Sequence, residues 1–309
     1  MKVLLVRTDS QLGDSIFETC FYRELKRCYP SSYVTVMACG NRRVLENLPY
    51  IDEFIWLPAR GLGRFLRAFA ALPYLWKQHY DVLVSLTPTW RMKLFNKLLP
   101  GKRKFPFEYR LGRPAVQAYV DILEQLGCRN VDSSYALVIP PQAAQEAAQF
   151  LSPLTGPFLL VNPVASEEEY TLPPQDTYQI IQRLRQAGLD APIVLLDYKN
   201  QYAVAEGDKV YRFTGNDVLA VAALVARAAY VLTVDTAISH MAAAFKRPMT
   251  VLFTDQPRRA LPRAKALEHL DSFAPRTANT CVLWAKHSVR AIDPAEIVRS
   301  VLCGWQKGA

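Results

Sequence analysis

The sequence predicts an α/β protein of two domains, each built on a parallel sheet with helices on its faces. Its 309 residues suffice for two hydrophobic cores of about 150 residues each. Short apolar runs alternate with stretches of helical spacing, which is the order of βα units. This alternation starts again after residues 140–157, where prolines interrupt it. Half of the residues are hydrophobic and 21% are charged, a composition typical of folded chains rather than disordered ones.

The first half of the chain contains four short apolar runs that predict strands and three amphipathic segments that predict helices. The expected strands are residues 2–6, 33–38, 54–57 and 81–86, and the expected helices are residues 14–29, 62–78 and 117–126. Gly13 opens the first helix, Pro30 ends it, and Gly127 stops the last one.

The second half repeats the pattern of the first. The expected strands are residues 158–162, 192–196, 230–234 and 250–253, and the expected helices are residues 176–188, 218–228, 241–245 and 294–302. We place one domain over residues 1–150 and the other over residues 151–309, and the final helix can pack on either. Because α/β sheets bind ligands beyond the carboxyl ends of their strands, we expect function in a cleft between the domains.

The positive charge of the chain is concentrated in one segment. The net charge is +9, and between Arg60 and Arg113 there are 12 Lys or Arg against 2 acids, whereas the rest holds 25 basic and 26 acidic residues. A confined basic segment favours an anionic partner such as a phosphorylated lipid, a nucleic acid or an anionic sugar polymer. A solvated surface is the alternative.

Other features of the sequence concern location and redox chemistry. No apolar stretch approaches the roughly 18 residues of a membrane-spanning helix, and the N-terminus lacks the order of a signal peptide, so we expect a cytoplasmic protein. The six cysteines are far apart and form no C-x-x-C pair. This spacing predicts neither a zinc site nor a disulfide framework.

The first of three junctions suited to chemistry is the loop after the first predicted strand, residues 7–14. Gly13 permits a tight turn with close approach of a ligand, and Asp14 stands where the positive end of the following helix favours its charge. An Asp at this position is also a common helix cap. Asp9 competes with Asp14 for a catalytic role.

Two further junctions follow strands of the second half. Backbone amides of residues 161–166 could hold a phosphate if the acidic residues 167–169 turn outward, although a solvated acidic loop is the alternative. Asp235, Thr236 and His240 lie where a predicted strand meets a helix, so that the helix N-terminus could meet a diphosphate. A capped helix with an incidental His is the alternative there.

Taken in order, these junctions resemble glycosyltransferase family 9, the ADP-heptose lipopolysaccharide heptosyltransferases. The resemblance spans nearly the whole chain. The residues that carry it are Val6, Arg7, Thr8, Asp9, Leu12, Gly13, Asp14, residues 50–53, Asn162, Pro163, Ser166, Pro173, Pro174, Asp235, Thr236 and residues 239–243.

The resemblance implies an inverting, metal-independent transferase without cofactor, in which two Rossmann-like domains face a central cleft in the GT-B architecture. It implies an N-terminal domain that binds the acceptor, a C-terminal domain that binds the nucleotide sugar, and Asp14 as general base. The implied donor-binding residues are Gly13, Ser166, Asp235, Thr236, Ala237 and His240, and the implied acceptor-binding residues are Arg60, Arg64 and Arg67. The implied partners are a nucleotide sugar, an anionic lipopolysaccharide-type acceptor and, peripherally, the inner membrane, with no nucleic acid.

Two positions depart from the family pattern. Tyr170 stands where members usually carry a Lys that holds the phosphates, and the loss of such a charged hydrogen bond weakens binding by roughly 1.5 to 3 kcal/mol. Ala237 places a methyl group where the family has Gly. Lys199, Arg258 and Arg259 are candidates for the missing cation.

Other functions remain open at the level of sequence. A nucleotide-binding protein of the same fold with weak or lost catalysis would explain Tyr170 and Ala237. A transferase that uses a different nucleotide sugar is a second alternative. A nucleic-acid surface on the basic segment is a third, but no recognition-helix, RNP or zinc pattern accompanies it.

Overall fold

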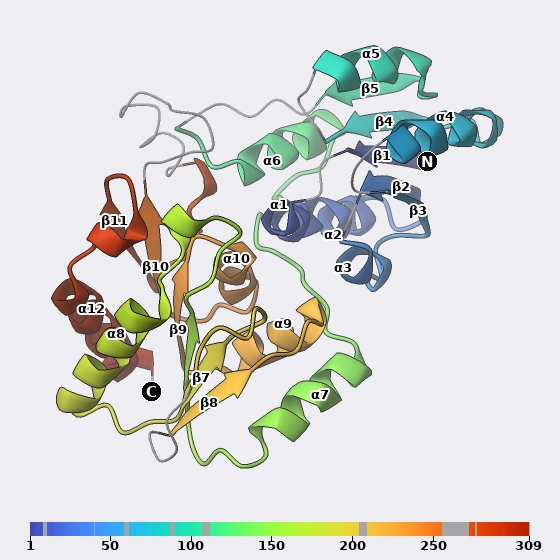
Figure 1. The fold of residues 1–309 in the computed structure, drawn as a ribbon. Coiled ribbons are helices and arrows are strands. Elements are labelled where there is room, and N and C mark those ends of the chain that lie inside the picture. Colours follow the sequence, from blue (N-terminus) through green and yellow to red (C-terminus); the bar gives the residue numbers. More distant parts are fainter. Residues whose placement is uncertain are drawn as a thin grey trace. The chain divides into compact units, whose positions relative to one another are not determined.

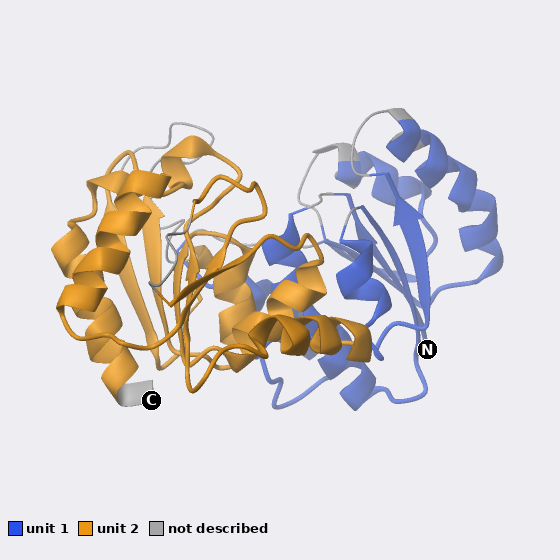
Figure 2. Ribbon diagram, turned by 60° about the horizontal axis from the view of Figure 1, so that its bottom comes forward, with its two compact units in different colours: residues 1–138 blue, residues 139–309 orange. Residues whose placement is uncertain are grey.

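The computed structural model describes residues 1–8, 11–39, 41–58, 62–86, 90–106, 112–203, 209–254, 272–275 and 277–308. The chain divides into two compact units, Met1–Val138 and Ile139–Ala309 (Figure 2). Each unit is an α/β structure with a wholly parallel sheet among its described residues (Figure 1). The predicted fold class is therefore confirmed.

The sheet of the first unit has the order β3-β2-β1-β4-β5. Its strands are β1 (Lys2–Arg7), β2 (Tyr33–Cys39), β3 (Glu53–Leu57), β4 (Val82–Ser85) and β5 (Arg103–Pro106). Its helices are α1 (Leu12–Phe17), α2 (Thr19–Cys28), α3 (Arg42–Glu46), α4 (Leu62–Lys77), α5 (Trp90–Leu98) and α6 (Val116–Gln125). The central strand β1 is fully buried from Val3 to Val6, as a strand covered on both faces must be.

The sheet of the second unit has the order β11-β10-β9-β6-β7-β8. Its strands are β6 (Leu159–Asn162), β7 (Ile193–Leu196), β8 (Val210–Phe213), β9 (Tyr230–Val234), β10 (Met249–Thr254) and β11 (Thr280–Ala285). Its helices are α7 (Pro141–Leu151), α8 (Pro174–Gln186), α9 (Val218–Arg227), α10 (Ala237–Ala244) and α12 (Pro294–Gly308), with the 3-10 turns η1 (Glu168–Tyr170) and η2 (Val289–Ala291).

The strands that the sequence did not predict are β5, β8 and β11, and all three lie at or near the edge of their sheet. An edge strand is covered less completely, so its sequence does not form a continuous apolar run. In β5, for example, three of the four residues are exposed.

In both sheets the strand order reverses next to the first strand of the unit. The chain runs from β1 outward to β3 and then returns to place β4 on the other side of β1, and β6 and β9 are neighbours in the same way. At such a reversal the connections leave in opposite directions, which opens a crevice at the carboxyl ends of the two strands. All three junctions singled out in the sequence follow one of these strands.

The first predicted helix, residues 14–29, is two helices in the structure. Helix α1 already begins at Leu12, and α2 begins at Thr19. Glu18 lies at the junction with φ −69° and ψ −13°. Its carboxylate is fully buried.

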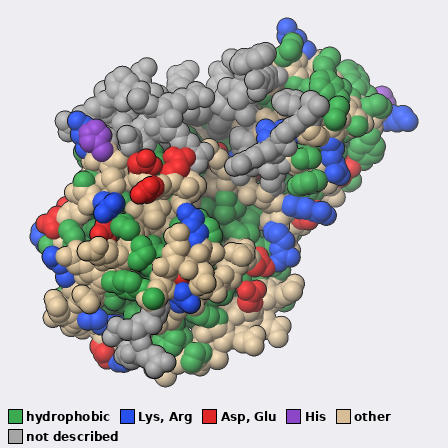
Figure 3. All heavy atoms as spheres, in the orientation of Figure 1, with side chains coloured by type: hydrophobic (Ala, Val, Ile, Leu, Met, Phe, Trp, Pro, Cys, Tyr) green, Lys and Arg blue, Asp and Glu red, His purple; other side chains and the backbone are tan. Residues whose placement is uncertain are grey.

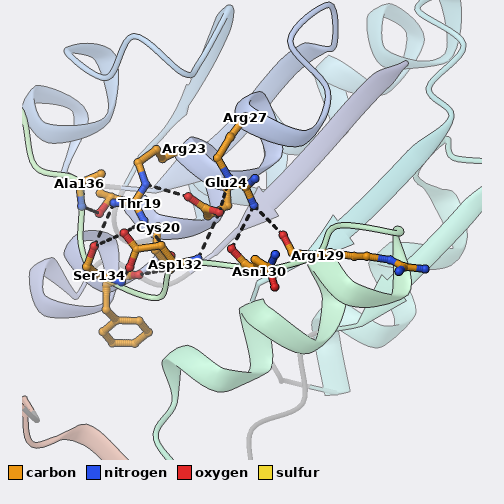
Figure 4. Close-up of polar contacts among 11 residues, drawn as sticks. Thr19, Cys20, Arg23, Glu24, Arg27, Arg129, Asn130, Asp132, Ser134 and Ala136 are labelled. Carbon is orange, nitrogen blue, oxygen red and sulfur yellow. Dashed lines mark hydrogen bonds and ion pairs between the residues drawn. The ribbon is translucent and has the colours of Figure 1, made fainter.

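Side chains of helix α2 form hydrogen bonds with residues 129–136, the segment that follows α6 and leads out of the first unit (Figure 4). The buried carboxylate of Glu24 accepts hydrogen bonds from Nε of Arg23 at 3.1 Å and from Nε of Arg27 at 2.7 Å. The same guanidinium groups donate to backbone carbonyls beyond α6, Arg23 to Asp132 at 2.7 Å and Arg27 to Arg129 at 2.9 Å. These charge-assisted bonds keep the segment on the first unit.

The division between Val138 and Ile139 replaces the boundary that the sequence suggested between residues 150 and 151. Helix α7 belongs to the second unit because it packs on α9, with Ala143 and Ala147 fully buried. The final helix α12 packs on α8, β9 and β10, so it covers the sheet of its own unit.

Two further features concern the helices and the cysteines of the described residues. None of their helices has both the length and the apolar character needed to span a bilayer. All six cysteines are free thiols.

Candidate functional site

Asp14 lies in the first turn of α1, shortly after the end of β1. Its side chain is 26% exposed, so a ligand can reach it. The expectation of a tight turn at Gly13 is wrong, because Gly13 lies within helix α1. The amide dipoles of a first helical turn favour a negative charge at Asp14. Asp9 lies outside the described residues.

Two carboxylates share one buried guanidinium at this end of β1. Arg7 is 1% exposed. Its Nη1 lies 2.7 Å from Oε2 of Glu18, and its Nη2 lies 3.3 Å from Oδ2 of Asp14. Nη2 also donates to the carbonyl of Gln11 at 3.3 Å. The Arg7–Glu18 pair is the shorter and the more deeply buried, so Glu18 neutralises most of the Arg7 charge while Arg7 still orients Asp14.

A phenol borders this charge cluster. Tyr119 of α6 is 2% exposed, and burial, together with the nearby Glu18 carboxylate, raises its pKa well above the ordinary value. Tyr119 therefore stays neutral at physiological pH. The sequence indicated Arg7 and Asp14 but missed Glu18, whose only signal is an acid on the inward side of a helix, where it needs a buried partner.

The acceptor-binding arginines implied by the resemblance occupy different surroundings. Arg64 on α4 is half-buried, and its Nη1 donates to the carbonyl of Thr8, just beyond β1, at 2.8 Å. Arg67 is exposed, and its guanidinium lies 5.1 Å from the centroid of the Trp56 ring, within cation–π range. The structure thus brings Arg64 to the end of β1. Arg60 lies outside the described residues.

In the second unit, Asn162 joins the two polar junctions. It lies opposite Thr233 in the parallel pairing of β6 and β9. Its Nδ2 donates to Oγ1 of Thr233 and to Oγ1 of Thr236, both at 2.9 Å. Thr236 is the N-cap of α10 and accepts the amide of Ile238 at 3.3 Å. The sequence analysis named Asn162 among the family-like residues but assigned it no role, because only the strand pairing shows which groups its side chain contacts.

Burial favours the neutral forms of Asp235 and His240. Asp235 is partly buried, and among the described residues no cation or donor bonds its carboxylate; burial raises its pKa to about 7. His240 lies inside α10, which begins at Ala237 and not at residue 241, and it is 7% exposed. Burial lowers the pKa of His240 to about 4, so its ring is neutral at physiological pH and supplies no cation for a phosphate.

The loop after β6 has a cation beside it that comes from another loop. Ser166 is exposed in this loop, and Tyr170 packs against the hydrophobic core of the unit. Nζ of Lys199, which follows β7, lies 3.2 Å from the carbonyl oxygen of Ala165. Lys199 therefore brings an ammonium group to the loop in which Tyr170 offers none.

The acidic residues of the same loop differ in exposure. Glu168 and Glu169 are exposed and Glu167 is half-buried, so two of the three carboxylates face solvent. Arg258 and Arg259 lie outside the described residues. In the part of the chain that the structure describes, no three His, Cys, Asp or Glu side chains gather in a way that could hold a metal ion.

Two Rossmann-like units, one with an oriented carboxylate and the other with a Thr-capped helix N-terminus at the strand reversal, have the make-up of a glycosyltransferase. The family model described as glycosyltransferase family 9 (heptosyltransferase) matches residues 90–282, which is more than half of the chain. The chain belongs to this family and is a glycosyltransferase. The matched range contains Asn162 and residues 235–240, whereas Asp14 lies before it. No curated protein is significantly similar in sequence.

Solved structures share the fold over the whole length of the chain. A family 9 glycosyl transferase from Veillonella parvula is 17% identical, with a TM-score of 0.78 over 99% of this chain and 98% of that chain. E. coli ADP-heptose lipopolysaccharide heptosyltransferase II is 18% identical, with a TM-score of 0.74 over 99% of both chains. E. coli heptosyltransferase WaaC with ADP is 18% identical, with a TM-score of 0.71 over 100% of this chain and 99% of that chain.

The Arg7–Glu18 pair gives a prediction about stability. Arg7→Met removes the cation that compensates a buried carboxylate, and we expect it to lower the free energy of unfolding by about 3 to 5 kcal/mol in urea denaturation. Replacing both residues with Met should restore much of this loss. Arg42→Met, which breaks the exposed pair with Glu46, is the control and should change stability by less than about 1 kcal/mol. An Arg7→Met protein as stable as this control would contradict the assigned role of the pair.

The raised pKa of Asp235 gives a prediction about pH. Its ordinary value is 3.8 and its value in the fold is about 7, so between these values the folded protein retains a proton that the unfolded chain releases. The contribution of Asp235 to the free energy of unfolding is therefore fully present at low pH and is lost as pH rises toward 7. The Asp235→Asn side chain is neutral at every pH. The melting temperature of this variant minus that of the wild type should therefore increase from pH 4 to pH 7 and stay constant above pH 7.

His240 acts in the opposite direction below its unfolded pKa of 6.5, but it is present in both proteins and cancels in their difference. Melting temperatures of both proteins over this pH range measure the effect. A difference that does not change with pH would show that Asp235 is ionised in the fold with an ordinary pKa.

Proposed function

We propose that this glycosyltransferase moves a heptose from ADP-heptose to an acceptor of the lipopolysaccharide-core type. The observation that carries the proposal is the Asp14 carboxylate, which the buried Arg7 orients at the end of β1 in a chain of family 9. Similarity of fold to E. coli heptosyltransferase II and to WaaC with ADP supports the choice of donor.

In this proposal Asp14 is the general base. Its accessible carboxylate removes the proton of the acceptor hydroxyl while the hydroxyl oxygen bonds the anomeric carbon of the sugar, and the bond from that carbon to the ADP oxygen breaks on the opposite face. Arg7 positions the carboxylate. Glu18 keeps Arg7 from holding Asp14 as a fully matched ion pair, which would make it a weaker base.

The diphosphate would be held by the second unit. The N-terminus of α10, fixed by the bond from Asn162 to Thr236, favours an anion, and Ser166 contributes a hydroxyl. Ala237 begins the helix, so its methyl group limits how closely the phosphate approaches. We assign to Lys199 the cationic role for which Tyr170 is unsuited. The reaction needs no metal in this proposal, and undiminished transfer in the presence of EDTA would support that.

Features of the first unit support the proposed acceptor and the proposed place of the reaction. Arg64 lies next to the end of β1, and Arg67 is exposed on the same helix, so both suit the phosphates and carboxylates of an anionic saccharide. A lipid-linked acceptor would bring the enzyme to the cytoplasmic face of the inner membrane. Between Arg60 and Arg113 there are 12 basic and 2 acidic residues, and this positive charge supports both the anionic acceptor and the membrane location.

Donor choice is tested by thermal shift with ADP, UDP, GDP and CMP. A nucleotide at 100 times its dissociation constant stabilises the protein by roughly 2.7 kcal/mol, so ADP alone should raise the melting temperature distinctly. Lys199→Met should weaken ADP binding about 10-fold or more, since it removes a charged hydrogen bond, and Lys286→Met, an exposed lysine after β11, should not. A shift with another nucleotide but not with ADP would refute the donor.

The base assignment is tested by Asp14→Asn, which keeps the shape and removes the basic group. We expect the rate of heptose transfer to fall about 100- to 10,000-fold, with ADP affinity within about twofold of the wild type. Asp176→Asn is the matched control, because Asp176 is the acid in the first turn of α8. Normal transfer by Asp14→Asn would show that another group takes the proton.

A nucleotide-binding protein with weak catalysis is the second candidate, favoured by the packing of Tyr170 against the core and by Ala237. Single-turnover assays of the wild type with ADP-heptose and purified lipopolysaccharide core distinguish the two. ADP binding without product would favour this candidate, and rapid product formation would remove it.

A further inference from the structure

Large apolar side chains are exposed together on α4 and α5. Along α4, Leu66, Phe69, Pro73 and Trp76 are exposed at spacings of three and four residues, which place them on one face of the helix. The exposed fractions are 62% for Leu66, 48% for Phe69 and 55% for Trp76. On α5, Leu94 and Leu98 are 57% and 46% exposed. We call these six residues the α4–α5 face.

The two helices are fixed to each other and to the core. The rings of Phe69 and Phe95 meet edge to face at 5.4 Å between centroids. Nε1 of Trp76 donates to the carbonyl of Leu98 at 3.0 Å. Their opposite sides are buried through residues such as Leu75 and Met92, so the apolar core of the unit is already complete without the α4–α5 face.

Two exposed lysines adjoin this apolar face. Lys77 follows Trp76 and Lys97 precedes Leu98, and both lysines are exposed without an ionic partner among the described residues. The nearby acid Asp81 is paired with Lys102 at 2.8 Å. Figure 3 shows hydrophobic side chains with Lys and Arg side chains beside them over the region that Figure 1 labels α4 and α5.

We infer that the α4–α5 face docks on an anionic lipid bilayer. Exposed Leu, Phe and Trp side chains on one side of a helix, flanked by lysines, are suited to the boundary between headgroups and acyl chains, where apolar burial and attraction to anionic lipid add. A second copy of the chain fits less well, because two copies of a segment with 12 basic and 2 acidic residues repel each other.

The same helix connects this face to the proposed base. Arg64, on the first turns of α4, bonds the carbonyl of Thr8, a few residues before Asp14 in the chain. A bilayer under α4 would therefore lie near the end of β1, where a lipid-anchored acceptor would present its saccharide. The purpose of docking thus rests on the proposed function, whereas the binding itself does not.

Vesicle co-sedimentation tests the inference. The wild type should bind vesicles of phosphatidylcholine with phosphatidylglycerol, bind those of phosphatidylcholine alone far less, and dissociate at high salt. We expect vesicle affinity to fall at least roughly 10-fold in each of two variants, Leu66→Ser/Leu94→Ser/Leu98→Ser and Lys77→Glu/Lys97→Glu. Tyr33→Ser, an aromatic residue 41% exposed at the start of β2, and Lys286→Glu/Arg299→Glu in the second unit are matched controls and should bind as the wild type does.

Melting temperature and the ADP-induced shift should be unchanged in the triple serine variant, which separates loss of docking from loss of folding. Absence of wild-type binding to the anionic vesicles at low salt would overturn the inference, as would full binding by the triple variant. A wild-type dimer that this variant dissociates, without vesicle binding, would assign the face to a second copy instead. Vesicle binding without heptose transfer would refute the proposed function and leave the docking surface in place.

Discussion

The reversal of strand order beside β1 and beside β6 is the constraint on which the sites of both units depend. Parallel strands all end at one edge of the sheet, and the reversal opens that edge by sending neighbouring connections apart. Asp14 follows β1, and residues 235–240 follow β9, the neighbour of β6. Residues that are far apart in sequence, such as Asn162 and Thr236, are thereby brought within hydrogen-bond distance.

The two units use charge in different ways at these edges. In the first, a buried guanidinium serves one buried and one accessible carboxylate, an arrangement suited to a base that must be ionised and held in place. In the second, burial favours the neutral forms of Asp235 and His240. In the proposed reaction, helix N-terminal amides, hydroxyl groups and Lys199 would bind the anionic leaving group, and a neutral Asp235 would not repel it.

The basic segment of the first unit serves more than one contact. Arg64 turns inward to the end of β1, and Arg67 stacks on Trp56. Lys77 and Lys97 instead remain at the surface beside an apolar stripe. Because α4 carries Arg64, Arg67 and Lys77, the proposed capture of an anionic saccharide and the proposed contact with an anionic lipid surface would involve the same helix.

The sequence by itself determined the βα order, the central strands and the three junctions, because buried strands are continuous apolar runs and helices leave a periodic pattern. It did not determine the edge strands β5, β8 and β11, whose less complete burial weakens that pattern. Only the tertiary structure decided that the first unit extends to Val138, because the bonds from Arg23 and Arg27 reach more than 100 residues along the chain. The partners of Glu18, Asn162 and Lys199 were likewise decided by strand pairing and packing, since no local sequence rule states what a side chain meets across a sheet.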